Sequence, residues 1–161
     1  MEWYDEERID DIMLYGKCDA LDVAEYILWY CENELNKPIN NLRLQKTLYY
    51  IQGEYLRVYG EPLFDNDMEA WTYGVVVPDV YYYYNNFIGD NIVGITRLHE
   101  DSLDSKDLKI IHYILNKTLD VNIWEIVEKM QQEDPWKYNY VEGYNNIVSI
   151  SDMKKWFCKE E

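Results

Sequence analysis

Histidine, cysteine and glycine are scarce in this 161-residue chain, and each shortage narrows the kinds of site it can hold. The three cysteines, Cys18, Cys31 and Cys158, form no C-x-x-C pair, which argues against a disulfide framework or a zinc knuckle. The two histidines, His99 and His112, belong to no HExxH motif, so we expect no metal site. The seven glycines form neither a G-x-G-x-x-G nor a Walker-type loop, and the chain has no G-x-S-x-G elbow.

Basic residues and long apolar runs are also in short supply. The chain has 15 Lys+Arg against 31 Asp+Glu, a net charge of -16, so it repels phosphate backbones and we expect no direct nucleic-acid binding. No apolar run is long enough to cross a bilayer, and the acidic opening residues do not resemble a signal peptide. We therefore expect a cytoplasmic protein without membrane contact. With 31 acids, a carboxylate pair suited to catalysis could be proposed almost anywhere, so such a pair is no evidence for an active site. Since the sequence shows no other catalytic motif, we expect no enzyme and no cofactor.

Acidic and aromatic residues are what the chain has in excess. Residues 1–34 hold 11 acids against Arg8 and Lys17, so the negative charge is concentrated towards the N-terminus. Such charge attracts a basic partner and speeds the encounter, or it only keeps the protein soluble. The 17 tyrosines and 6 tryptophans can fill a core, but both types are also favoured as interface anchors.

The spacing of apolar residues predicts mostly helix. The chain is 48% hydrophobic, which suits one compact domain. We expect an α+β fold, predominantly α: a single compact helical domain with a small antiparallel β element. The expected helices run from about Asp22 to Asn36, from Asn40 or Asn41 to Gly60, and onward from Asp104 or Ser105, Asp120 and Ser151. Extended segments are expected at 68–73 and 91–96, paired as in a hairpin, with an aromatic-rich loop over 133–146.

The stretch GVVVPDVYYYYNNF, residues 74–87, combines strand-like and helix-like signals. Proline is favoured at the first helical position and an acid complements the helix dipole, so Pro78-Asp79 predicts a helix start. Tyr81 to Tyr84 then sweep roughly 300° around the helix axis. We expect a buried stripe formed by Val80, Tyr81, Tyr84 and Ile88. At least one of Tyr82 and Tyr83 must then be exposed.

A basic cluster, Arg43-Leu44-Gln45-Lys46, opens the second expected helix of this acidic chain. The simplest interpretation pairs Arg43 and Lys46 with the protein's own carboxylates, while Gln45 caps or bridges backbone groups.

Several ordered motifs around this cluster resemble the Panacea domain family. The family reads LRLQKLLYY, G-x-PLF, EAW and GPVVP-x-VY, and the chain has matching stretches at 41–50, 60–64, 69–71 and 74–81. Residues 133–136 and 150–157 are similar to its late PW signature and closing helix, so the likeness covers about 20–158. The chain departs from the family at Val75, where proline is usual, and at Gln131, where histidine is usual.

The resemblance implies a domain at 20–158 behind an acidic lead-in at 1–19. It also assigns a set of motif positions: Arg43, Leu44, Gln45, Lys46, Tyr49, Trp71, Gly74, Pro78, Tyr81, Pro135 and Trp136.

The resemblance further implies an antitoxin, encoded on a prophage or other mobile element, that neutralises a cognate toxin by direct protein–protein contact. We expect the partner to contact Asp10, Asp11, Tyr82, Tyr83 and Trp136. An alternative is an acidic phage-encoded inhibitor of a host defence nuclease, whose carboxylates imitate a nucleic-acid backbone. A third interpretation, a hydrolase or transferase, requires the Arg/Gln/Lys, Trp and Pro-Trp positions to converge on one pocket.

Overall fold

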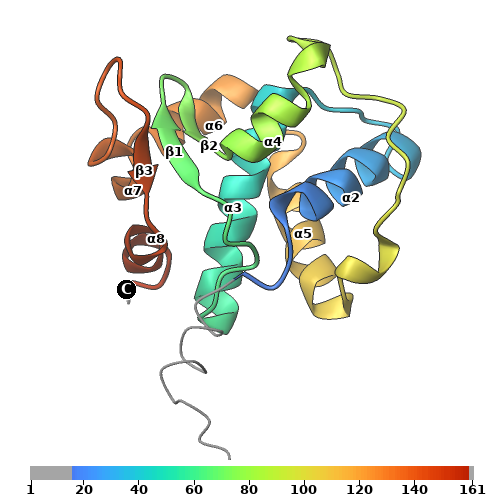
Figure 1. Ribbon diagram of the computed structural model, residues 1–161, viewed down its shortest axis with the longest axis horizontal. Coiled ribbons are helices and arrows are strands. Elements are labelled where there is room, and N and C mark those ends of the chain that lie inside the picture. Colours follow the sequence, from blue (N-terminus) through green and yellow to red (C-terminus); the bar gives the residue numbers. More distant parts are fainter. Residues whose placement is uncertain (1–15, 160–161) are drawn as a thin grey trace, which may run out of the picture.

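The computed structural model describes residues 16–159, which form seven α-helices, two 3₁₀ turns and three short strands (Figure 1). In chain order these elements are α2 (Ala20–Asn33), α3 (Asn41–Tyr59), β1 (Met68–Trp71), β2 (Gly74–Val76), α4 (Pro78–Tyr83), η1 (Asn85–Phe87), η2 (Glu100–Ser102), α5 (Ser105–Thr118), α6 (Ile123–Met130), α7 (Asp134–Lys137), β3 (Asn146–Val148) and α8 (Ile150–Phe157). The predicted α+β class, mainly α with a small antiparallel sheet, is confirmed.

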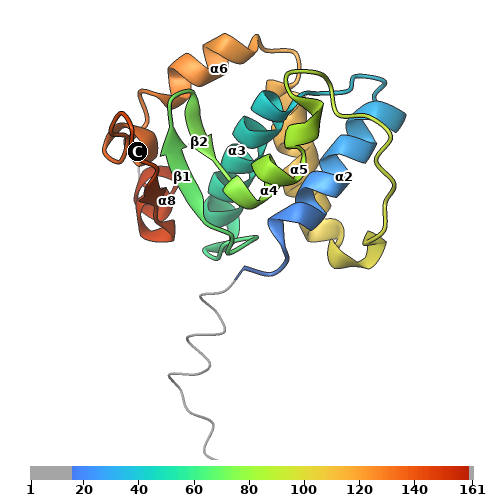
Figure 2. The same ribbon diagram turned by 45° about the horizontal axis from the view of Figure 1, so that its top comes forward.

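Helix α3 lies at the centre of the molecule. It contacts α2 and α5 on one side and β2 and α8 on the other, as Figures 1 and 2 show. Leu44, Leu48, Ile51 and Tyr55, which recur at helical spacing, are buried, and Tyr59 at the end of the same stripe is partly buried. A second face, which includes Gln45 and Gln52, is buried as well, because neighbouring elements surround the middle of α3, while Arg57 and Val58 near its end are exposed.

The two ends of α3 form as the sequence predicts. The Asn40 side chain accepts a hydrogen bond from the N–H of Arg43 at 3.0 Å, which caps the first turn. Gly60 ends the helix in the left-handed conformation, with φ 75°, and its N–H donates to the Leu56 carbonyl.

Replacement of Asn40 by alanine should lower the free energy of unfolding by about 1 kcal/mol, because the first turn of α3 loses its cap. Urea denaturation monitored by circular dichroism would measure the change. Asn33→Ala, at the exposed end of α2, serves as the control and should shift stability by less than about 0.5 kcal/mol. Equal losses in the two variants would contradict the capping role.

The sheet has the order β2-β1-β3, and both pairings are antiparallel. Trp71 pairs with Gly74 across the tight β1–β2 turn, and Met68 pairs with Val148 on the other side. The predicted strand at 91–96 is wrong. In this segment the Ile92 N–H donates to the Ile39 carbonyl, whereas the Gly94 N–H donates to the Glu32 carboxylate. The backbone therefore forms no continuous ladder with a second strand. The third strand comes instead from 146–148, at the end of the segment expected to be a loop.

Helix α4 begins at Pro78, as predicted, and ends at Tyr83, where a 3₁₀ turn takes over. Val80 and Tyr84 are buried and Tyr81 is half-buried, in agreement with the expected stripe. Ile88 was expected in that stripe and is 86% exposed, because the 3₁₀ turn rotates the chain away from the helical register.

Three other predicted helix starts are displaced by two residues or more. Asp19, rather than Asp22, caps α2, and that helix ends at Asn33 rather than Asn36. Asn122 caps α6 in place of Asp120, which instead pairs with Lys37. The closing helix α8 is capped by Ser149 rather than Ser151. In each case the residue that caps the helix lies two or three positions from the predicted one.

Helices α2 and α8, which flank α3, contribute to the same hydrophobic core. Ile27 of α2 and Met153 of α8 are fully buried beside α3. The boundaries of the domain at 20 and 158 remain a prediction.

Within residues 16–159, none of the helices combines the length and apolar character needed to cross a membrane.

Candidate functional site

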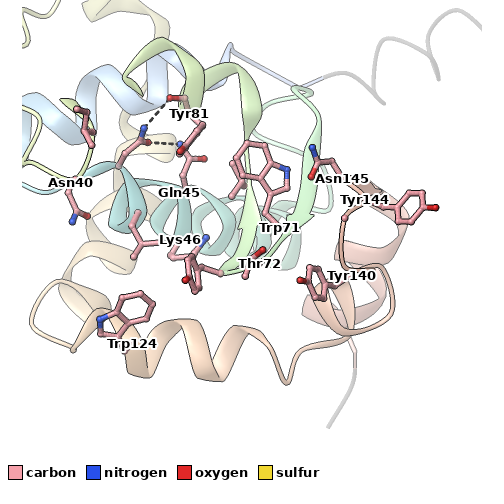
Figure 3. Close-up of a pocket in the computed structure, with 17 residues that line it drawn as sticks. Asn40, Gln45, Lys46, Trp71, Thr72, Tyr81, Trp124, Tyr140, Tyr144 and Asn145 are labelled. Carbon is pink, nitrogen blue, oxygen red and sulfur yellow. Dashed lines mark hydrogen bonds between the residues drawn. The ribbon is translucent and has the colours of Figure 1, made fainter. Parts of the chain in front are cut away.

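A cavity of about 570 Å³ opens where the N-terminal half of α3 meets the β1–β2 turn, α4, α6 and the 140–145 loop (Figure 3). We call it the α3 pocket. Four motif positions line it, namely Gln45, Lys46, Trp71 and Tyr81. Residues separated by more than 30 positions in the sequence are therefore brought together by the fold.

Two amide side chains hold one wall of the α3 pocket in place. The Gln45 amide nitrogen donates to Oδ1 of Asn41 at 2.9 Å, and its Oε1 accepts the N–H of Val77 at 2.8 Å. Asn41 in turn donates to the Tyr81 carbonyl at 3.0 Å. This chain of hydrogen bonds fastens the start of α3 to the start of α4. The prediction that Gln45 bridges backbone groups is therefore confirmed for Val77.

Lys46 lies at the inner end of the α3 pocket and is only 1% exposed. Its ammonium nitrogen donates to the Val75 carbonyl at 3.1 Å, and among residues 16–159 no carboxylate forms an ion pair with it. Burial lowers the pKa of Lys46 to about 7, because the charged form loses its hydration. The expectation that Lys46 pairs with an acid of the protein is wrong for the described residues.

Aromatic rings form the walls and the mouth of the α3 pocket. Trp71 meets Tyr81 edge to face, with ring centroids 5.0 Å apart, and also contacts Tyr82. On the opposite side, Tyr73 and Trp124 meet edge to face at 5.5 Å. Edge-to-face pairs of this kind stabilise one another beyond the area that they bury. These rings give the pocket flat walls with polar groups between them.

The late Pro-Trp motif supports the pocket from behind and does not line it. Pro135 is buried in the first turn of α7. Trp136 is half-buried, donates from Nε1 to the Trp71 carbonyl at 2.7 Å and stacks on Tyr140, a lining residue, at 4.5 Å. Gln131, at the position where the family has histidine, donates to the carbonyl of Thr72 in the β1–β2 turn.

The remaining motif residues fix the helices around the pocket. Arg43 donates to the carbonyls of Thr118 and Val121, at 2.9 and 2.7 Å, where α5 ends. The expected pairing of Arg43 with a carboxylate is wrong for residues 16–159, where its guanidinium donates to backbone oxygens instead. Leu44 belongs to the core, and the Tyr49 hydroxyl donates to the buried Glu133 at 2.8 Å. Burial, reinforced by Glu133, raises the pKa of Tyr49.

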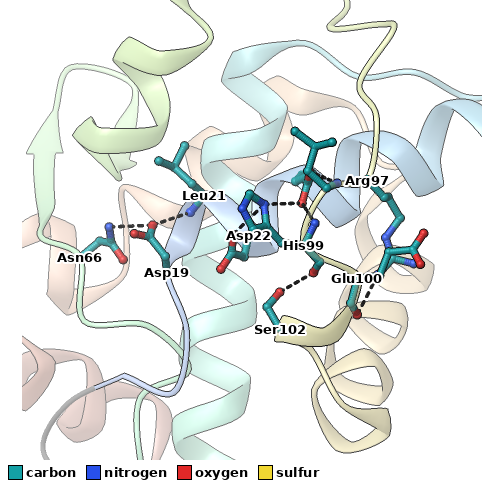
Figure 4. A network of polar contacts seen from close by, with 10 residues as sticks. Asp19, Leu21, Asp22, Asn66, Arg97, His99, Glu100 and Ser102 are labelled. Atoms are coloured by element: carbon teal, nitrogen blue, oxygen red, sulfur yellow. Dashed lines mark hydrogen bonds and ion pairs between the residues drawn. The ribbon is translucent and has the colours of Figure 1, made fainter.

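A second group of polar side chains lies beside a shallower cavity of about 530 Å³ on α2 (Figure 4). Asp22, Glu25 and His99 place one potential metal ligand each within 4.8 Å of one another. However, Glu25 already accepts the backbone N–H groups of Leu98 and His99, at 2.6 and 3.2 Å. Burial raises the pKa of Asp22. The hydrogen bonds explain this cluster as the attachment of the 94–99 loop to α2.

The predicted contact residues have different positions in the structure. Tyr82 and Tyr83 are 60% and 65% exposed, so the prediction that one of them faces solvent is confirmed for both. Asp10 and Asp11 lie outside the described residues. Sequence reasoning missed Tyr73 and Trp124, although Tyr73 stands in a tight turn and an exposed tryptophan beside a helix cap is a signal for an interface.

The lining of the α3 pocket favours binding chemistry. Its side chains are aromatic rings, aliphatic groups, amides, one aliphatic hydroxyl and one amine, with no carboxylate, histidine or cysteine from the described part of the chain. The convergence required by a hydrolase or transferase is met in part: Gln45, Lys46 and Trp71 converge, while Arg43 and Trp136 remain outside.

These features define a mainly helical α+β domain with an aromatic-walled pocket at the start of its central helix. The family described as "Antitoxin SocA-like, Panacea domain" matches residues 44–137, more than half of the chain. The chain belongs to this family.

A curated protein named "Antitoxin SocA", from Caulobacter vibrioides (strain NA1000 / CB15N), is 44% identical to the chain over 63 residues. The aligned part covers 39% of this chain and 33% of that relative, so the chain spans about a third of the relative's length. No solved structure matches.

Proposed function

We propose that this protein is an antitoxin that neutralises a toxin by binding it directly. Membership of the Antitoxin SocA-like family supports an antitoxin-type role. In this proposal the domain spans 20–158, acts in the cytoplasm without a catalytic step, and is encoded on a prophage or other mobile element.

The observation that carries the proposal is a group of exposed rings and one aliphatic side chain around the α3 pocket. We call this group the aromatic surface; it consists of Tyr73, Tyr82, Ile88, Trp124 and Tyr144, each more than half exposed. Soluble monomers rarely expose large apolar groups together unless they bind something there. Tyrosine and tryptophan are also the residues enriched among interface hot spots.

The charge of the protein suits a basic partner. A net charge of -16 accelerates the encounter with a positively charged protein and selects against acidic ones. Asp10 and Asp11 would contribute to this attraction. Charge reversal at both positions should weaken binding and reduce its dependence on salt, and unchanged affinity would remove the N-terminal segment from the interface.

Co-expression with the product of the adjacent gene tests the function itself. The expected result is a complex that survives purification, together with relief of the growth arrest that the neighbouring product causes alone. Without a complex and without relief, the antitoxin proposal fails. If the protein instead captures a host nuclease, and DNA competes with it for that nuclease, the protein is a nucleic-acid mimic and the antitoxin proposal is wrong.

The double variant Tyr82→Ala/Tyr83→Ala should weaken toxin binding by at least about tenfold, because it removes Tyr82 of the aromatic surface together with its exposed neighbour on α4, Tyr83. Tyr113→Ala on α5, a tyrosine that is also exposed, is the matched control and should change affinity by less than about twofold. Isothermal titration calorimetry would measure both. Equal affinities for the double variant and the wild type would exclude α4 from the interface.

A further inference from the structure

The α3 pocket contains a buried positive group without a counter-charge. The Lys46 amine is only 1% exposed and uses one of its N–H groups for the Val75 carbonyl. Among residues 16–159 no acid pairs with it, and the other polar side chains deep in the pocket, Asn41 and Gln45, already bind one another and the backbone. Lys46 therefore keeps donors free for a ligand.

Burial without a counter-charge makes the ammonium form of Lys46 costly, and its pKa falls to about 7. An anion placed beside the amine would offset that cost and accept its free N–H groups, since charge-assisted hydrogen bonds are the stronger kind. The binding free energy is therefore most favourable for a ligand that places one negative charge at the inner end of the pocket, beside Lys46.

The shape of the pocket indicates the shape of the rest of the ligand. Trp71 and Trp124 lie on either side of Lys46 in Figure 3, and their rings, with those of Tyr73 and Tyr81, make flat walls. The volume of about 570 Å³ falls within the usual range of small-molecule sites. A flat apolar or aromatic body fits such walls by stacking or by edge contacts.

The anion should carry a single charge. Phosphate groups are usually held by several donors, by arginine forks or by helix N-termini, whereas this pocket offers one amine. The net charge of -16 also disfavours multiply charged anions. A carboxylate satisfies both conditions.

We propose that the α3 pocket binds a small free carboxylic acid with a flat apolar body, its carboxylate on Lys46 and its body between Trp71 and Trp124. The ligand is a separate small molecule, because the cavity is larger than a single inserted side chain needs. The site is a property of the protein alone and does not depend on a toxin.

Naphthalene-2-carboxylate is a suitable probe, and its neutral carboxamide is the matched control compound. With the full-length protein, tryptophan fluorescence and ligand-observed NMR should show saturable binding of the acid, and the amide should bind at least about tenfold more weakly. Lys46→Met should reduce affinity for the acid at least about tenfold and abolish the preference for acid over amide. Lys117→Met, an exposed lysine on α5, should leave affinity within about twofold.

Trp124→Ala provides a second variant at a 53% exposed position, where loss of the fold is not expected. It should weaken both compounds by a similar factor, since it removes a wall and leaves the amine. The proposal is overturned if neither compound binds at about 5 mM, or if acid and amide bind equally in the wild type. Because the assay contains no toxin, its failure leaves the antitoxin proposal standing, and a failed toxin assay does not affect this result.

Discussion

Gly74→Ala should lower the free energy of unfolding by about 3 kcal/mol, because the added methyl group combines backbone strain with crowding. Gly74 has φ 118°, a conformation that side-chain-bearing residues rarely adopt. A Cβ there would lie 2.6 Å from the Met130 sulfur and 3.0 Å from Cε of Lys46. Both side chains are buried and have little room to move, so strain and crowding add.

Gly60→Ala is the matched control for that experiment. Gly60 also has a positive φ, 75°, but nothing lies within 4 Å of a Cβ at this position. Its replacement should cost only about 1 kcal/mol, which is the left-handed backbone penalty alone. Urea denaturation of the two variants would measure the difference. Equal losses would show that Lys46 and Met130 do not crowd Gly74.

The second large effect is a dependence of stability on pH that Lys46 introduces. Between about pH 7 and about pH 9 the free energy of unfolding of the wild type should rise by about 2 kcal/mol relative to that of Lys46→Met. In the unfolded chain this lysine has its ordinary pKa of 10.5 and keeps its proton throughout this range, whereas in the folded protein its pKa is about 7. The unfolded state therefore binds more protons between these pH values, and stability increases with pH.

The comparison with Lys46→Met isolates this effect from other titrations. Burial raises the pKa of Cys18 to about 12 and that of Cys31 to about 11, so their unfolded thiols ionise first and oppose the rise at the alkaline end. Both proteins share these groups, so their contribution cancels in the difference. Parallel stability curves for wild type and variant would mean that Lys46 stays charged in the fold.

The sequence predicted features that depend on local chemistry. Pro78 starts α4, Gly60 ends α3, and Tyr82 and Tyr83 are exposed, because each follows from a few neighbouring residues. Sequence motifs likewise identified the family. The exact capping residue was harder to predict, since Asp19 and Asp22 are both capable of the role.

The burial of Lys46 could not be predicted because its causes lie far away in the chain. Val75 and Met130, which enclose it, come from β2 and α6, and a lysine in the first turns of a helix is normally solvated. The sequence offered one signal of this burial: Gln45, Tyr49 and Gln52 form a second, uncharged face of α3. A helix that is buried on two faces lies at the centre of a fold, where its lysine can be buried as well. The third strand, β3, pairs with β1 over more than 70 residues of sequence, which no local pattern reveals.

Arg43 shows how a motif residue can influence a site that it does not touch. Its guanidinium holds the carbonyls of Thr118 and Val121, and the next residue, Asn122, caps the helix that carries Trp124. The angle at which α6 leaves α5 is thus set by a side chain of α3. The position of Trp124 relative to Trp71, and with it the size of molecule that can enter, therefore depends on a residue that does not line the pocket.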